Sequence, residues 1–175
     1  MNKPEIIEKL NENHTEFIHY IETLSEEEFT HSKNDKWSAG QQLDHIIRAV
    51  KPLTQGFILP GFVLGFMFGK SNRPSKSYNE LVKKYHSKLE AGGRASGRFI
   101  PPKISYSQRE SLLKKLNALN STLSKQVNKF SEKDLNTYIL PHPLLGKLTI
   151  REMLYFTAYH VEHHQENIKK ALVAV

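Results

Sequence analysis

The stretch from Leu148 to Leu172 limits the possible folds more than any other part of the chain. Thr149 is followed three residues later by Glu152, a capping-box pattern that predicts the start of a helix. Apolar residues then recur along one stripe of that helix: Ile150, Met153, Leu154, Val161, Ile168 and Leu172. His164 falls inside this stripe and His160 lies at its edge, so we expect both imidazoles to point into the protein.

Two inward histidines four residues apart leave three interpretations open. Adjacent helical turns bring both rings to one place, so the pair can bind a single metal ion. The pair can equally form a hydrogen-bonded part of the core or carry proton chemistry. Histidine makes up 9 of the 175 residues, so pairs at this spacing also arise by chance.

Length and composition predict one domain over residues 1–175, with a substantial core. The chain contains no cysteine, which excludes thiolate ligands and leaves any metal to nitrogen and oxygen ligands. Its formal net charge is +7, but the basic residues are spread out and accompany no nucleic-acid-binding motif, so we expect no specific nucleic-acid partner. The N-terminus does not resemble a signal peptide, which favours a cytoplasmic location. The longest apolar run, residues 56–69, is shorter than the roughly 20 residues that a membrane span needs.

Helical periodicity predicts most of the remaining structure. Apolar residues at intervals of three and four indicate helices over about 4–23, 39–51, 78–89 and 107–130. The first helix carries His14 within its apolar stripe, as a core or pocket histidine, and the second is expected to end or kink at Pro52. No segment shows a useful length of strand-like alternation. The sequence therefore predicts an all-α fold, a four-helix bundle.

Two segments between these helices are expected to be irregular. Residues 56–76 combine glycines and Pro60 with aromatic side chains, which argues against a regular exposed helix. Their four phenylalanines and one methionine could line a pocket for an apolar ligand, fill the core or contact a second subunit. Residues 92–103 form a basic loop, interpreted as a connector or as a segment that reaches an anionic group.

His45 is harder to interpret from its own helix. On a helical wheel it lies about 100° from the nearest stripe residue, Ile46, and it shares its side with Gln41, Gln42 and Ala49. Geometry alone therefore predicts that His45 faces solvent or a groove. A ligand role requires this side to face a second packing surface or a cleft, and Ala49 would leave room for one.

Three motifs in chain order resemble the DinB-like (DinB/YfiT) superfamily. They are WSAGQQLDH at 37–45, HPLLG at 142–146 and the helix with HxxxHQxxI at 160–168. The resemblance covers almost the whole chain and implies a four-helix bundle. In this chain, an irregular apolar insert is expected between the second and third long helices. This insert, residues 56–69, does not belong to the family pattern. The substrate of a particular family member is therefore not assigned to this chain by the resemblance.

The resemblance also implies a metal site. In the family, one histidine of the second helix and two of the last surround a divalent metal; matched by motif, these are His45, His160 and His164. The side of the second helix that carries His45 would then face a cleft beside the last helix. Residues expected in the pocket or beside the ligands are His14, Gln41, Ala49 and His163, the last because it lies about 60° from His160 on the wheel.

Three neutral imidazoles leave a coordination position open, which is typical of catalytic metal sites. Nitrogen ligands favour zinc or nickel, with iron and manganese as alternatives. Similarity to metal-dependent thiol transferases of the family implies transfer of a low-molecular-weight thiol to an electrophile. The alternatives are metal-dependent hydrolysis, against which the lack of an inward carboxylate on the last helix argues, and a non-catalytic stress-related binding protein. A homodimer is also implied, with Tyr155 and Tyr159 as candidate contact residues.

Overall fold

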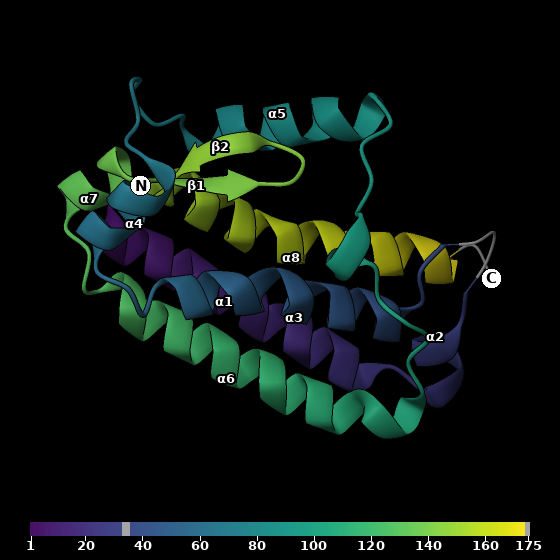
Figure 1. The fold of residues 1–175 in the computed structure, drawn as a ribbon. Helices are drawn as coiled ribbons and strands as arrows, with labels where there is room; N and C mark the ends of the chain where they lie inside the picture. The colour runs from purple at the N-terminus through teal and green to yellow at the C-terminus, as the bar shows by residue number, and fades with distance from the viewer. Residues whose placement is uncertain (33–35, 174–175) are drawn as a thin grey trace.

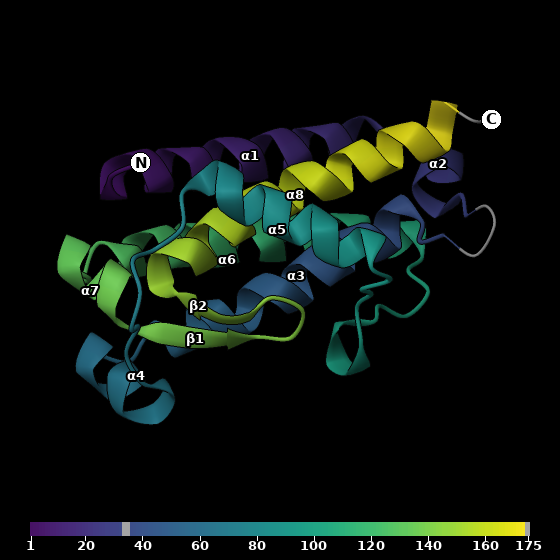
Figure 2. The ribbon, with the colours of Figure 1, turned by 90° about the horizontal axis from the view of Figure 1, so that it is seen from above.

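Four long helices form the body of the protein. The structure, a computed structural model, describes residues 1–32 and 36–173. The bundle consists of α1 (Lys3–Thr23), α3 (Ala39–Gly56), α6 (Arg109–Val127) and α8 (Ile150–Val173). Helices α1 and α3 each pack against both α6 and α8, so the four enclose one apolar core (Figures 1 and 2). The predicted all-α bundle is confirmed.

Shorter elements surround the bundle. They are α2 (Glu26–Thr30), α4 (Gly61–Phe68), α5 (Tyr78–Glu90), α7 (Glu132–Thr137) and the 3-10 turns Gly97–Phe99 and Tyr106–Gln108. Helix α5 lies along α8, whereas α4 lies at the edge of the molecule beyond the small sheet (Figure 2). The irregular structure predicted for residues 56–76 is therefore wrong over α4, which is helical despite its two glycines.

The sequence predicted that α3 would end or kink at Pro52. The helix does not end there but continues to Gly56. Proline removes one helical hydrogen bond, and its ring crowds the preceding turn. The turn that follows is nevertheless held in the core, because Leu53, Thr54 and Phe57 are all buried. No single helix in the described residues is long and apolar enough to cross a bilayer. Helices α3 and α4 would be long and apolar enough only in combination, and the chain bends by 108° between them.

A β-hairpin precedes the last helix, where the sequence predicted no strand. Strand β1 (Ile139–His142) pairs antiparallel with β2 (Gly146–Thr149), with Ile139 opposite Thr149. The HPLLG motif makes the turn: His142 Nδ1 accepts hydrogen bonds from the backbone N–H groups of Leu144 and Leu145, at 3.1 and 3.0 Å. Gly146 has a φ of 76°, a left-handed conformation that favours glycine.

The start of α8 is built around the buried carboxylate of Glu152. As predicted, Thr149 and Glu152 form a capping box, with backbone-to-side-chain bonds of 2.9 and 3.2 Å. The carboxylate also receives the Lys76 N–H at 2.8 Å and both terminal nitrogens of Arg73, at 2.6 and 2.8 Å. These bonds attach the segment before α5 to the first turn of α8.

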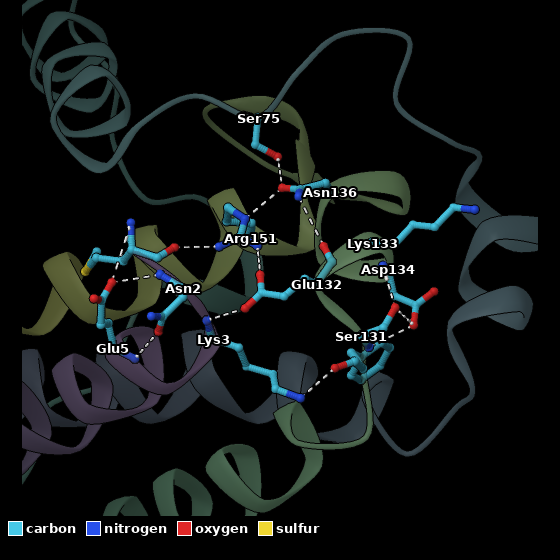
Figure 3. A network of polar contacts seen from close by, with 12 residues as sticks. Asn2, Lys3, Glu5, Ser75, Ser131, Glu132, Lys133, Asp134, Asn136 and Arg151 are labelled. Atoms are coloured by element: carbon cyan, nitrogen blue, oxygen red, sulfur yellow. Dashed lines mark hydrogen bonds and ion pairs between the residues drawn. The ribbon is translucent and has the colours of Figure 1, made fainter.

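A second polar network joins the N-terminus to α7 and α8 (Figure 3). The Arg151 guanidinium donates to Asn136 Oδ1 at 2.7 Å, to the Met1 carbonyl at 2.7 Å and to the Glu132 carboxylate. Glu132 also accepts the backbone N–H of Lys3 at 2.6 Å. The first turn of α1 is thereby fixed against the last helix.

Tyr155 contributes to the same contact region and not to a subunit interface. Its ring is buried within the chain, and its hydroxyl donates to the Met1 carbonyl at 3.2 Å. It therefore offers no surface to a second copy, and this part of the sequence interpretation was wrong. Tyr159 is half-buried beside α5, where its hydroxyl lies 2.5 Å from His86 Nε2. The homodimer stays a prediction.

The Glu152 network generates a stability prediction. An Arg73→Ala substitution leaves a buried carboxylate without its cation, so we expect the free energy of unfolding to fall by about 3 kcal/mol. The matched control is Lys114→Ala, which removes an exposed ion pair with Glu110 and should cost less than about 1 kcal/mol. Urea unfolding followed by circular dichroism measures both, and equal losses would contradict this account of Glu152.

Candidate metal centre

Three histidines from two helices meet in the interior between α3 and α8. His160 Nε2 lies 3.0 Å from His164 Nε2 and 3.3 Å from His45 Nε2. One potential ligand atom from each ring lies within 4.8 Å of the others, and all three residues are buried. The structure therefore brings together the three residues that the family resemblance suggested, as a cluster that could hold a metal ion.

His45 is buried, with only 6% of its surface exposed, so the solvent-facing alternative from the helical wheel was wrong. The side of α3 that carries it faces α8 and the 3-10 turn Gly97–Phe99. The Phe99 carbonyl oxygen lies 2.7 Å from His45 Nδ1. Since a carbonyl can only accept, Nδ1 carries the proton, and the Nε2 lone pair points at the other two rings.

Gln42 orients His164 in the same way. Its side-chain nitrogen donates to the Trp37 carbonyl at 3.2 Å, so its oxygen faces His164 Nδ1, at 2.9 Å. Nδ1 of His164 therefore carries the proton as well. Gln41, which the sequence placed in the pocket or beside the ligands, instead caps α3 through Ser38, at 3.1 and 3.3 Å. Sequence reasoning missed Gln42, although its position three residues before His45 puts both on one side of α3.

The proton count of this cluster fits a bound cation. His45 and His164 both use their single neutral-state proton on Nδ1, so their Nε2 atoms offer only lone pairs. His160 can place at most one N–H between the rings, and that group can point fully at only one neighbour. One buried lone pair is then left without a donor, whereas a cation at the centre would engage all three.

Burial keeps these rings neutral. It lowers the pKa of His160 and His164 well below the usual value of 6.5, and each is further lowered by neighbouring histidines. Burial also lowers the pKa of His45, against an opposing effect of the Phe99 carbonyl. Neutral imidazole is the form that binds a metal, so burial prepares the cluster for a cation.

The other expected pocket residues have different surroundings. Ala49 lines the cavity described below, one turn after His45, as the sequence suggested. His14 is fully buried in the core with Nδ1 2.8 Å from the Leu10 carbonyl, and it lies outside that cavity. His163 lies beside the cluster: its ring centroid is 5.5 Å from that of His164, and its Nε2 is 3.1 Å from the Asn167 amide.

A cavity of about 580 Å³ opens onto the cluster at His45 and His160. Its walls are largely apolar and come from α3, α4, α5, α8, the hairpin and residues 94–99. Phe57, Leu64 and Phe68 of the apolar insert contribute to it, so the pocket-lining interpretation holds for two of the four phenylalanines of that segment. Among the described residues, the charged lining groups are Arg94 and Arg98, and no carboxylate is present.

His142 is a polar cavity residue that the sequence did not single out as functional. Its Nδ1 accepts two backbone N–H groups of the hairpin turn, so its proton lies on Nε2. Burial, and then the charge of Lys84, lowers its pKa to about 4. His142 therefore stays neutral and supplies an N–H donor to the cavity.

Comparison with protein families agrees with this geometry. The model of the DinB superfamily matches residues 9–168. The chain therefore belongs to the DinB superfamily, and the resemblance seen in its motifs is confirmed. Neither the curated proteins nor the solved structures gave a match.

The neutral buried histidines generate a prediction about acid stability. Burial lowers the pKa of His14 to about 4, whereas an unfolded histidine titrates near 6.5. The unfolded state therefore binds more protons between these values, and stability falls as the pH is lowered from 6.5 to 4. His14 alone should contribute about 3 kcal/mol to this loss.

Denaturant unfolding in chelator at several pH values measures the effect. A His14→Leu variant, which cannot titrate, should lose less stability than the wild type over the same interval. A control His19→Leu variant, which removes a histidine from the solvent-accessible part of α1, should keep the wild-type pH dependence. An unchanged slope for His14→Leu would rule out this residue as a source of acid sensitivity.

Proposed function

We propose that the protein is a divalent-metal-dependent enzyme that transfers a low-molecular-weight thiol to an electrophile with an apolar body. The observation that carries the proposal is the convergence of three imidazole nitrogen atoms at the end of a largely apolar cavity. Membership of the DinB superfamily supports the same site. His45, His160 and His164 would hold the cation, and their all-nitrogen set favours zinc or nickel.

A bound divalent cation would supply the acidity that converts a thiol into its thiolate near neutral pH. The thiol is a second substrate, because the chain has no cysteine. Its sulfur forms a bond to the electrophilic carbon with its own electron pair, its proton goes to solvent, and the leaving group departs as an anion. The chain contributes by holding the ligands in place through Phe99 and Gln42 and by keeping water away with apolar walls.

Two features of the cavity favour particular substrates. The His142 N–H can donate a hydrogen bond to an oxygen of the electrophile or to the leaving group. Arg94 and Arg98, without a carboxylate in the described lining, favour a neutral or anionic electrophile over a cationic one. Because no carboxylate lines the described cavity, metal-dependent hydrolysis lacks an Asp or Glu that could act as its general base. Thiol transfer is therefore the better-supported reaction.

Thiol consumption tests the proposal. Zinc- or nickel-loaded protein should accelerate the reaction of glutathione, cysteine or another small thiol with a chlorinated aromatic electrophile, as measured with a thiol-reactive dye. The chelated protein and the His160→Ala variant should fall at least tenfold toward the uncatalysed rate. Equal rates for all three samples would reject the enzyme, and metal content well below one ion per chain would favour the non-catalytic alternative.

Gln42 allows a separate test of the metal site. A Gln42→Leu substitution removes the acceptor that orients His164, so we expect metal affinity to fall by roughly 10- to 100-fold. The matched control is Gln41→Leu, which removes a helix cap but no contact with the histidines. Competition with a chromogenic chelator measures both affinities. Similar losses for both variants would assign the effect to α3 stability instead.

A further inference from the structure

Helix α4 faces the protein with its glycines and faces solvent with large apolar side chains, which is the reverse of an ordinary surface helix. Its small residues face the protein: a Cβ at Gly61 would lie 2.7 Å, and one at Gly65 2.5 Å, from the ring of Tyr138. Leu64 is buried on the same inner side. A surface helix normally buries its large apolar side chains and exposes polar ones. Here the close approach to Tyr138 requires the glycines to lie inside.

The large apolar side chains of this region consequently face solvent. We define the α4 face as Ile58, Phe62, Phe66 and Met67, with exposed fractions of 65, 70, 92 and 54%. In the described residues these are four of the seven large hydrophobic side chains that are exposed, and they lie within ten residues of sequence. Monomeric proteins rarely expose such a cluster unless it binds a partner or a membrane.

The backbone holds α4 firmly in this orientation. Directly after the helix, the Gly69 carbonyl accepts the N–H of Ile139 at 3.3 Å, and the N–H of Ser71 donates to the Thr137 carbonyl at 2.7 Å. Lys70 pairs with Tyr138 across an isolated bridge. The helix is thus held against the start of the hairpin along its glycine side and at its C-terminal end. It cannot rotate to bury Phe62 and Phe66 without breaking these bonds.

The charged residues that flank α4 in the sequence all have one sign. Between Asp44 and Glu80 the chain contains no acidic residue and five basic ones: Arg48, Lys51, Lys70, Arg73 and Lys76. Arg48 and Arg73 form ion pairs, whereas Lys51 and Lys70 are exposed on either side of the apolar run in the sequence. An apolar face with flanking lysines is complementary to a surface that has an apolar interior and an anionic outer layer.

We propose that the α4 face docks onto the surface of an anionic lipid bilayer. Eight residues of helix are about 12 Å long, too short to cross a hydrocarbon core of about 30 Å, and α3 is committed to the bundle. The helix lies along the interface, with Phe62 and Phe66 among the acyl chains and the lysines at the headgroups. A second copy fits less well, because two-fold symmetry would place the same lysine-flanked faces against each other.

The absence of cysteine makes a direct test available. A Phe66→Cys variant carries a single thiol for an environment-sensitive fluorophore such as NBD. On vesicles of phosphatidylcholine and phosphatidylglycerol in equal amounts, the label should shift to the blue and brighten at least twofold, and on pure phosphatidylcholine it should respond less. The control is Ile100→Cys, an exposed apolar position outside α4, whose label should not respond.

Vesicle co-sedimentation of the unlabelled protein gives the second measurement. Phe62→Ser with Phe66→Ser should weaken binding at least tenfold, and Lys51→Gln with Lys70→Gln should weaken binding to anionic vesicles only. Lys114→Gln with Lys115→Gln removes the same charge from exposed positions in the first half of α6 and should bind like the wild type. Circular dichroism confirms that each variant is folded.

Two outcomes would overturn the proposal. One is wild-type binding by the Phe62→Ser, Phe66→Ser variant, which would show that the α4 face does not touch lipid. The other is a dimer in sedimentation velocity that this variant loses, together with no response of the Phe66→Cys label to vesicles, which would assign the face to a second copy. Neither outcome bears on metal binding or thiol consumption, so the two proposals can be judged separately.

Discussion

The arrangement of the candidate metal centre depends on the burial of three neutral imidazole rings between α3 and α8. Polar rings in an apolar interior are unfavourable unless their nitrogen atoms find partners. His45 and His164 each donate one proton to a carbonyl oxygen, from Phe99 and Gln42, and direct the remaining lone pair toward His160. The cluster therefore exists only when the start of α3, the 3-10 turn Gly97–Phe99 and the last helix are all in place.

The long helices and the inward side of α8 could be predicted because their information is local. A period of 3.6 residues is visible in the sequence, and it places His160 and His164 inside without knowledge of any other segment. The same wheel failed for His45, since it describes only how a residue lies relative to the apolar stripe of its own helix. The turn that covers His45 is 54 residues further along the chain, and only the family motif indicated that this side is enclosed.

Other features escaped prediction because distant contacts override local preference. The strands of the hairpin have four residues each, and Pro141 interrupts the pattern of the first, so no alternation is visible. Helix α4 contains glycines that normally weaken a helix, but here they admit the ring of Tyr138, which is distant in the sequence. Gln41 and Gln42 differ by one position, and only coordinates reveal which of them reaches a histidine.

The segment from Arg94 to Phe99 belongs to the cavity wall and also fixes the His45 ring through the Phe99 carbonyl. Occupancy of the cavity and occupancy of the histidine cluster thus share one structural element. Thermodynamic linkage between two sites is reciprocal, so a cavity ligand that steadies this segment would strengthen cation binding by the same factor by which a bound cation would strengthen binding of that ligand. If both sites bind as proposed, displacing this segment would weaken both affinities together, even with every histidine intact.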